Sequence, residues 1–259
     1  MMDLTNYSKH GITGNTIVTR GEIPGISEMQ VEGEVRNLGI VKHFKNHSLL
    51  GSLIRQDFSI AWVHLDPDEV LEVHNHNVPS MIIAIEGGGS SQGDSEINFS
   101  AGDIVFIPSW NEHGFTGAKP SGLWALSIQF NDVAIFEDEV DPLTSYDLTN
   151  IPSIEERQLI LFSRNKDRNL FKSEGVSRHI PSYVNFNWHS LDNKFSLERP
   201  PSETLRLILH GSPQGNYKFD KSLLTPGDLI VQTEDLDYHN TESTGNHWLL
   251  TIDISTLKQ

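Results

Sequence analysis

The chain has 259 residues and a formal net charge of −16, with only 19 Lys and Arg. Such a surface repels phosphate backbones and anionic lipid, so we predict neither a nucleic-acid nor a membrane partner. There is no cysteine, which excludes disulfides, thiolate metal ligands and cysteine nucleophiles and fits a reducing compartment.

The first fifteen residues, MMDLTNYSKHGITGN, are polar and lack the apolar stretch of a signal peptide, and no apolar run reaches the length of a membrane span. We therefore expect a cytoplasmic protein. The histidines near this end, including His43 and His47, lie among polar residues and are expected to be solvated.

Short apolar segments, bounded by Gly, Pro, Asn and Asp, follow along the chain. In order they are SIAWVHL, SMIIAIE, DIVFIPS, LWALSIQF, ETLRLILHG, DLIVQT and HWLLTIDI. Segments of this length and composition are typical of strands, and several are apolar on both faces, so we predict an all-β sandwich or barrel. A helix is predicted only near residues 153–162, where Ser153 and Glu156 suit a capping box; this segment could equally end in a strand.

The two halves of the chain repeat the same landmarks. A glycine after an apolar strand (Gly87, Gly211), a Gly-Asp pair opening the next strand (Gly102, Gly227) and a Trp opening a third recur at spacings that agree to within one residue. Three landmarks in register indicate a duplication. We predict a first domain over residues 1–137, an acidic linker over 138–153 and a second domain over 154–259.

Three histidines stand at the points where strands of the first half begin or end. His74 and His76 are two apart, so on a strand both imidazoles point to one face. His113 follows the segment GDIVFIPSWNE, from which a neighbouring antiparallel strand can deliver a third imidazole to the same place. Three imidazoles at one point predict a metal site.

These residues resemble the two motifs of the cupin superfamily. His74, His76 and Gly87 match the first motif, and Gly102, Pro108 and His113 match the second. The sequence departs from the motifs at four positions, which are Asp68 and Trp110 in place of Gly, Ser80 in place of Glu and Gly117 in place of Asn. Together with the repeat, the resemblance implies a bicupin of two tandem β-barrels or jelly rolls.

Ser80 stands where many cupins have a glutamate metal ligand, and it cannot replace a charged ligand. The remaining three neutral imidazoles suit Fe(II), Ni(II), Cu(II) or Zn(II) better than Mg(II), and Mn(II) is a further candidate. Three protein ligands leave positions open for water, substrate or dioxygen, as in catalytic sites. Sulfur and β-diketone dioxygenases among the cupins resemble this pattern.

The second half lacks the equivalent ligands. Counting from Gly211 and Gly227, the ligand positions fall on Glu198, Pro200, Thr204 and Tyr238, with His239 one step away. We expect this barrel to hold no metal and to serve packing, homodimer formation or closure of the first barrel.

Further residues are predicted to line the pocket. His64 and Gln129 lie on strands beside the barrel interior and are candidates for contacting substrate or orienting a ligand imidazole. Trp62, Ser80, Trp110 and Trp124 are predicted to shape the substrate pocket; the alternative for each Trp is an ordinary core position.

Taken together, the sequence predicts a metal-dependent cupin enzyme, first of all a non-haem Fe(II) oxygenase or dioxygenase acting on a small, anionic, chelating molecule. Two alternatives stay open. One is a non-redox isomerase, cyclase or lyase that uses the metal as a Lewis acid. The other is a small-molecule sensor without catalysis, like the cupin domains of AraC-type regulators, although no helix-turn-helix follows.

Overall fold

The structure is a computed structural model. It describes residues 14–31, 34–55, 58–130, 153–163, 171, 177, 180–190, 194–211, 217–219, 222–224, 227–239 and 248–255. The chain forms two compact units. Residues 23–167 make the unit called here the first barrel, and residues 1–22 with 168–259 make the second barrel. No helix in the described ranges is both long and apolar enough to cross a membrane.

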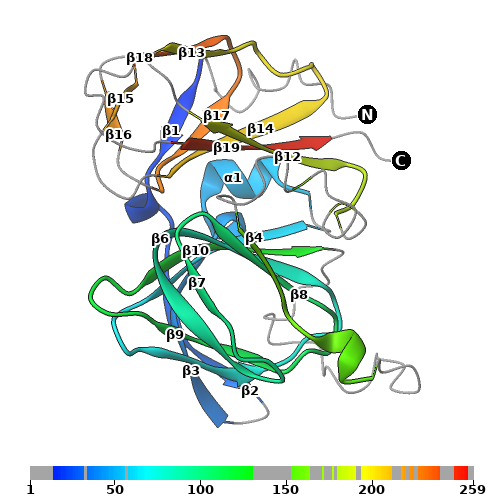
Figure 1. The fold of residues 1–259 in the computed structure, drawn as a ribbon. Coiled ribbons are helices and arrows are strands. Elements are labelled where there is room, and N and C mark those ends of the chain that lie inside the picture. The colour runs from blue at the N-terminus through cyan, green and yellow to red at the C-terminus, as the bar shows by residue number, and fades with distance from the viewer. Residues whose placement is uncertain are drawn as a thin grey trace. The chain divides into compact units, whose positions relative to one another are not determined.

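The first barrel is built almost wholly of antiparallel strands (Figure 1). Its strands are β2 (Ile26–Val31), β3 (Glu34–His43), β4 (Phe58–Leu65), β5 (Val70–His74), β6 (Ser80–Gly93), β7 (Asn98–Ser100), β8 (Asp103–Ile107), β9 (His113–Gly117), β10 (Leu123–Phe130) and β11 (Ile160–Ser163). The main sheet has the order β11-β8-β6-β10-β4-β3-β2. Strands β7 and β9 pair with β6, and β5 pairs with β9.

Strand β6 is long enough to take part in both sheets of the first barrel. Its first half pairs with β8 and β10, and its second half pairs with β7 and β9. The strand turns at Gly87, whose φ of 68° is left-handed. A Cβ atom there would lie 2.0 Å from the Gly122 carbonyl oxygen, so only glycine fits the turn.

The interior of the first barrel is apolar. The side chains that form it are every second residue along each strand. Residues of one parity, such as Ala61, Val63, Ile82 and Ala84, form a single buried cluster with Phe115 and others. Residues of the other parity on the same strands, such as Trp62 and Ile83, are also buried. This explains why the predicted strands are apolar on both faces.

Within the described residues, the second barrel repeats this plan with nine strands. Its strands are β1 (Thr16–Val18), β12 (Val184–Ser190), β13 (Lys194–Leu197), β14 (Thr204–Gly211), β15 (Tyr217–Phe219), β16 (Ser222–Leu224), β17 (Leu229–Gln232), β18 (Leu236–His239) and β19 (Trp248–Ser255). One sheet has the order β1-β17-β14-β19-β12, and β13-β18 and β15-β16 form two pairs. The repeated Gly-Asp turns have the same backbone form, since φ is 90° at Gly102 and 84° at Gly227.

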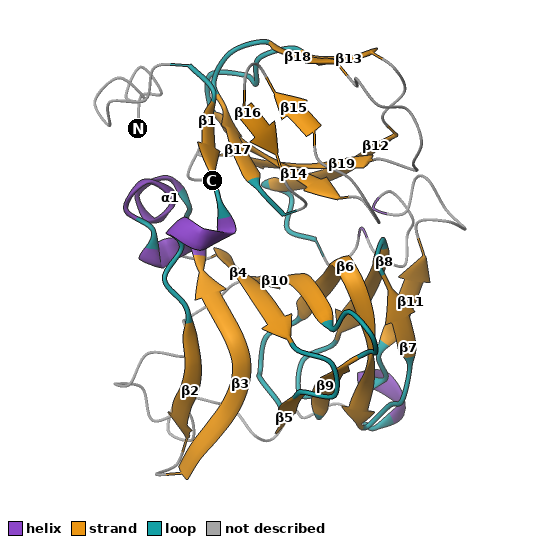
Figure 2. Cartoon of the chain, turned by 90° about the vertical axis from the view of Figure 1, so that its left-hand side faces the viewer, coloured by secondary structure: helices purple, strands orange, loops and turns teal. Residues whose placement is uncertain are grey.

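All seven predicted strand segments are strands, but the unit boundaries differ from the predicted domains. β1 pairs with β17 of the second barrel, and β11 pairs with β8 of the first (Figure 2). The first strand of the N-terminal half therefore completes a sheet of the second barrel, and a strand that follows the predicted linker completes the sheet of the first barrel. The predicted linker, residues 138–153, lies outside the described residues except for Ser153.

In the described part of the chain the helices are few and short. At the predicted helix, the Ser153 amide donates to Glu156 Oε2 at 3.0 Å, as in a capping box, but only a 3₁₀ turn follows, η5 (Glu155–Arg157), before β11. Both sequence alternatives for this segment are thus present in part. The sequence did not predict the short helix α1 (Ser48–Leu53) or the 3₁₀ turns η2 (Arg20–Glu22) and η3 (Phe44–Asn46).

Four glycine positions of the cupin motifs keep a left-handed backbone in this chain. Gly87 and Gly102 are glycines, while Asp68 and Trp110, each with a φ of 65°, hold the same backbone form with a side chain. A non-glycine residue in this region is strained, by roughly 1 kcal/mol or more. The backbone therefore supports the alignment of Asp68 and Trp110 with motif glycines.

We predict that Asp68→Gly raises the free energy of unfolding by about 1 kcal/mol, because it removes the left-handed strain. The substitution also removes the Asp68–Lys119 ion pair, but this pair is exposed on both sides and contributes little. Urea unfolding of the variant measures the change. Asp66→Gly, at an exposed position without a left-handed φ, is the matched control and should destabilise; a loss of stability in Asp68→Gly as well would contradict the prediction.

Candidate metal centre

The three predicted ligand histidines come together at one end of the first barrel. His74 ends β5 and is directly opposite His113, the first residue of β9, while His76 lies in the loop after β5. The ring centres lie 4.5 Å apart for His74–His113, 4.9 Å for His76–His113 and 6.2 Å for His74–His76. Imidazoles that share a metal at roughly 2.0–2.1 Å have ring centres about 4.5 to 6 Å apart. The two separations from His113 fall in this range, and the His74–His76 separation is wider.

Each of the three rings is held by the same kind of hydrogen bond. Nδ1 lies 2.9 Å from the Glu72 carbonyl oxygen in His74, 2.6 Å from that of Val78 in His76 and 2.9 Å from that of Asn111 in His113. A carbonyl only accepts, so each Nδ1 carries the proton and donates it. The Nε2 atoms are therefore the lone-pair donors, which is the arrangement by which proteins orient metal-binding histidines.

Burial keeps the two inner imidazoles neutral. His76 is 5% exposed and His113 is 2% exposed. Burial lowers the pKa of His76 to about 4, with a smaller contribution from the nearby His74 ring. It also lowers the pKa of His113 well below the usual value, helped by His74 and His76. Neutral imidazole is the form that binds metal.

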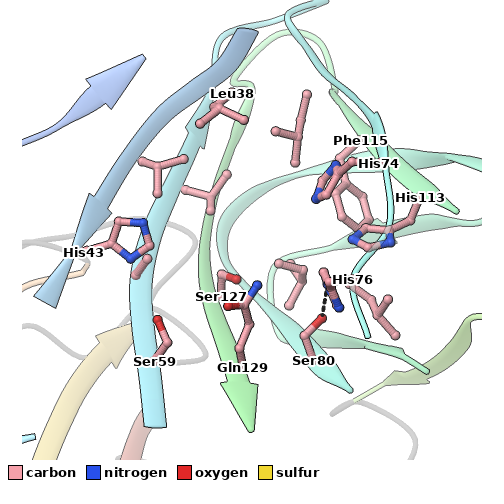
Figure 3. A pocket seen from close by; sticks show the side chains of 16 residues that line it. Leu38, His43, Ser59, His74, His76, Ser80, His113, Phe115, Ser127 and Gln129 are labelled. Atoms are coloured by element: carbon pink, nitrogen blue, oxygen red, sulfur yellow. Dashed lines mark hydrogen bonds between the residues drawn. The ribbon is translucent and has the colours of Figure 1, made fainter. Parts of the chain in front are cut away.

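The donor set fits a transition metal in kind, but the Nε2 atoms are not gathered around one point. Within the ranges that the structure describes, no three His, Cys, Asp or Glu side chains have the geometry of a metal site. His76 Nε2 instead lies 3.1 Å from Ser80 Oγ (Figure 3). Three neutral rings do not attract one another, so ligation requires His76 to exchange this hydrogen bond for a metal.

A network of hydrogen bonds fixes the loop that carries His113. The Trp110 amide, set by its left-handed φ, donates to the His76 carbonyl at 2.7 Å and joins the two ligand loops. The fully buried Asn111 side chain donates to the Arg157 carbonyl at 2.5 Å, and Arg157 Nη1 donates to the Trp110 carbonyl at 2.5 Å. Arg157 thus clamps this loop from the segment that leads into β11.

The histidines open onto a cavity inside the barrel (Figure 3). Its lining consists of Leu38, Val41, His43, Ser59, Ala61, Val63, Leu71, His74, His76, Ser80, Ile82, Ile107, His113, Phe115, Ser127 and Gln129. The walls are mainly aliphatic, with polar groups in two places. One is the histidine cluster with Ser80, and the other is the sheet face that carries His43, Ser59, Ser127 and Gln129.

Of the residues predicted to line the pocket, Ser80 and Gln129 do so and four do not. Ser59, Ala61 and Val63 of β4 line the cavity, so His64 and Trp62 between them face the other side of the sheet. Trp124, opposite His64 on β10, is on that side too, and its ring stacks on His64 at 4.2 Å. These three side chains lie on the opposite side of the sheet from this cavity, one residue of strand parity away from its lining.

Trp110 is likewise not part of the cavity lining. Its backbone serves the site, because the Trp110 amide donates to the His76 carbonyl and the Trp110 carbonyl accepts from Arg157 Nη1.

Sequence reasoning missed His43, which was expected to be solvated. It is 6% exposed and faces the cavity from the end of β3. The sequence GIVKHF does not show which parity faces inward, because Ile40 and Val41 are both apolar. In the structure Val41 and His43 are on the buried parity, and Ile40 and Lys42 are more exposed.

The second barrel fills the equivalent interior with an ion pair. When the sheets are aligned on the Gly102 and Gly227 turns and on Trp124 and Trp248, the pairings place Arg206 of β14 at the position of Ser80 and Asp253 of β19 at that of Gln129. Arg206 Nε and Nη2 donate to the two Asp253 carboxylate oxygens at 2.5 and 2.9 Å. Arg206 Nη1 also lies 3.3 Å from Gln232 Oε1. At the positions equivalent to the HxH ligands, Glu198 is exposed and Pro200 is buried.

A cupin domain model matches residues 61–128, which span β4 to β10 and hold all three histidines. Over nearly its whole length the chain has the fold of solved two-barrel structures. The crystal structure of protein Ylba from E. coli is similar with a TM-score of 0.55 at 13% identity, covering 95% of this chain and 93% of that one.

Two further similar structures are vicilin from tomato and a variant of Bacillus subtilis oxalate decarboxylase. Vicilin has a TM-score of 0.57 at 10% identity and covers 92% of this chain and 84% of that chain. The oxalate decarboxylase variant has a TM-score of 0.52 at 11% identity and covers 96% and 80%. At these identities the likeness shows the cupin fold alone. No curated protein sequence matches the chain significantly.

We predict that Asn111→Ala weakens transition-metal binding by roughly 10-fold to 100-fold, as loss of a group that orients a ligand typically does. The substitution removes the bond to the Arg157 carbonyl and frees the loop that positions His113, but it leaves every imidazole in place. Competition with a chromophoric chelator measures the affinity. The matched control is Asn98→Ala, at an exposed position on β7; equal affinity in both variants would show that the clamp has no part in metal binding.

The buried histidines predict a pH dependence of stability. Burial, and next the charge of Lys45, lower the pKa of His43 from 6.5 to about 4. Between these values the unfolded chain binds more protons than the folded one, so the free energy of unfolding falls as the pH falls. In metal-free protein, His43→Gln should reduce this fall by about 3 kcal/mol between pH 7 and pH 4. Urea unfolding at both pH values measures it, and an unchanged pH dependence would contradict the burial of a neutral imidazole.

Proposed function

We propose that the first barrel binds one divalent transition metal through Nε2 of His74, His76 and His113, and acts as a metal-dependent enzyme on a small organic molecule. The observation that carries the proposal is the common orientation of the three rings. Each Nδ1 donates to a backbone carbonyl, so three buried or half-buried imidazoles offer Nε2 at one end of a cavity. Cupin domains often bind divalent metals, which agrees with this use.

The ligand set favours a transition metal and, within that group, leaves a choice. Neutral imidazoles suit Fe(II), Ni(II), Cu(II), Zn(II) or Mn(II). We propose Fe(II) and an oxygenase or dioxygenase reaction, in which the bound iron would supply the redox chemistry with dioxygen. Ser80 stands at the motif position of the glutamate ligand. Because its side chain is small and carries no carboxylate, it would leave room beside the metal for substrate and dioxygen.

The residues around the ligands suit an anionic, chelating substrate. The cavity lining contains no Asp or Glu that would repel an anion or neutralise the metal charge. Aliphatic walls, including Leu71, Ile82 and Ile107, exclude water around the reacting group, and low polarity strengthens the attraction between opposite charges.

The Ser80–His76 hydrogen bond favours a second candidate, a cupin that binds a small molecule without catalysis. A hydroxyl that satisfies His76 Nε2 can keep the histidines as polar lining without a metal. A metal-dependent isomerase, cyclase or lyase is the remaining alternative within enzymes. The similar structures include a decarboxylase by name, so the fold itself is compatible with chemistry other than oxygenation.

Metal analysis of protein purified without chelators tests the proposal. We expect about one equivalent of a transition metal per chain in the wild type and its loss in the triple variant His74→Ala, His76→Ala, His113→Ala. Chelator should lower the melting temperature of the wild type only, because metal binding is coupled to stability. Ser80→Glu, which restores a carboxylate at the motif position, should bind the metal at least 10-fold more tightly.

Less than a tenth of an equivalent after reloading with Fe(II), Ni(II), Cu(II), Zn(II) and Mn(II) in turn would overturn the enzyme proposal in favour of the binding module. If metal is bound, oxygen uptake with a panel of chelating acids separates the two enzyme classes. Turnover that consumes oxygen supports the oxygenase, and turnover without it supports the Lewis-acid alternative.

A further inference from the structure

The sheet face opposite the histidines carries a row of uncharged polar groups. Ser59 of β4, Gln129 of β10 and Ser80 of β6 are directly opposite one another in the strand pairing, and all three line the cavity. His43 lies on β3 beside this row, across the cavity from His74 and His113 (Figure 3). Ser80 contacts His76, so the row links both polar ends of the cavity.

Gln129 has an unsatisfied acceptor in this row. The side chain is 7% exposed, yet its Oε1 atom has no hydrogen-bond partner within the described part of the chain. A buried acceptor without a partner costs roughly 1–3 kcal/mol, and native proteins place such groups where a water or ligand donates to them. Because Gln129 lines the cavity, the missing donor belongs to whatever occupies it.

The surroundings of Gln129 carry no compensating charge. None of the 16 lining side chains is Asp, Glu, Lys or Arg. Burial lowers the pKa of His43 to about 4, so its imidazole is neutral near pH 7 and can donate or accept a hydrogen bond without carrying charge. A charged group at this end would be buried without a partner, which is strongly unfavourable.

We propose that Gln129, with Ser59 and His43, forms a second binding point that takes an uncharged hydrogen-bond donor of the ligand, such as a hydroxyl or a primary amide. The ligand class is then a small molecule with an apolar body and a neutral polar end, whose opposite end meets the histidine cluster. Dianions and phosphate esters that place charge at Gln129 are excluded from the cavity. This inference rests on the proposed function only in taking the cavity as the place where substrate binds.

Two probes of equal size test the binding point in metal-free protein. Butyramide carries an uncharged amide donor, and butyrate carries a carboxylate on the same alkyl chain. Ligand-observed NMR titration of the unmodified protein at pH 7.5 should give a dissociation constant for butyramide at least 5-fold lower than for butyrate. This comparison needs no variant, so it stands even if a substituted chain fails to fold.

Gln129→Met keeps the volume and removes the acceptor, so it should weaken butyramide binding at least 3-fold and leave butyrate binding unchanged. The matched control is Gln92→Met, because Gln92 lies on β6 outside the cavity and donates to Thr116 Oγ1. The control should bind both probes as the wild type does.

Butyrate binding as tight as butyramide binding would overturn the proposal, as would an amide preference that persists in Gln129→Met. Failure of the proposed function has a different signature. In that case the protein takes up no metal, while the preference for butyramide and its dependence on Gln129 remain.

Discussion

Each strand of the first barrel turns alternate side chains inward, and this two-residue period decides which groups can meet a ligand. Along β4 it sends Ser59, Ala61 and Val63 to the cavity and Trp62 and His64 away from it. Along β10 it does the same for Ser127 and Gln129 against Trp124. The histidine cluster depends on the same rule, because His74 and His113 meet only when β5 and β9 pair in the observed register.

The rule also marks where sequence reasoning holds and where it fails. The HxH spacing and the Gly-Asp turn before His113 were sufficient to predict the cluster, since both are local patterns. The residues of β4 that face inward could not be read from the local sequence. The strand is apolar on both faces, so nothing in it shows which side faces the cavity. The inward face becomes visible only when the pairing of β4 with β3 and β10 is known. The burial of His43 and the outward direction of Trp62, His64 and Trp124 were not predicted for this reason.

The orientation of the imidazoles depends on contacts that no motif records. Backbone carbonyls of Glu72, Val78 and Asn111 select the tautomer, and Arg157 holds the loop around Trp110 and Asn111. Arg157 is distant in the sequence and follows residues 131–152, so its role follows from β11 returning to β8. By contrast, the left-handed backbone at Asp68 and Trp110 could have been predicted, because the motif comparison already placed both on glycine positions.

Strand β1 of the first half pairs in the second barrel, and β11 of the second half pairs in the first barrel. This arrangement limits how the two halves can be separated. A gene cut at the repeat boundary would yield a first half with an apolar strand, β1, that has no sheet to join. That half would also lose β11 and expose the edge of β8, and exposed edges promote aggregation. The second half would lose β1 from β17. A single cut between the two halves therefore does not yield two complete barrels. A first barrel produced on its own has to span residues 23–167.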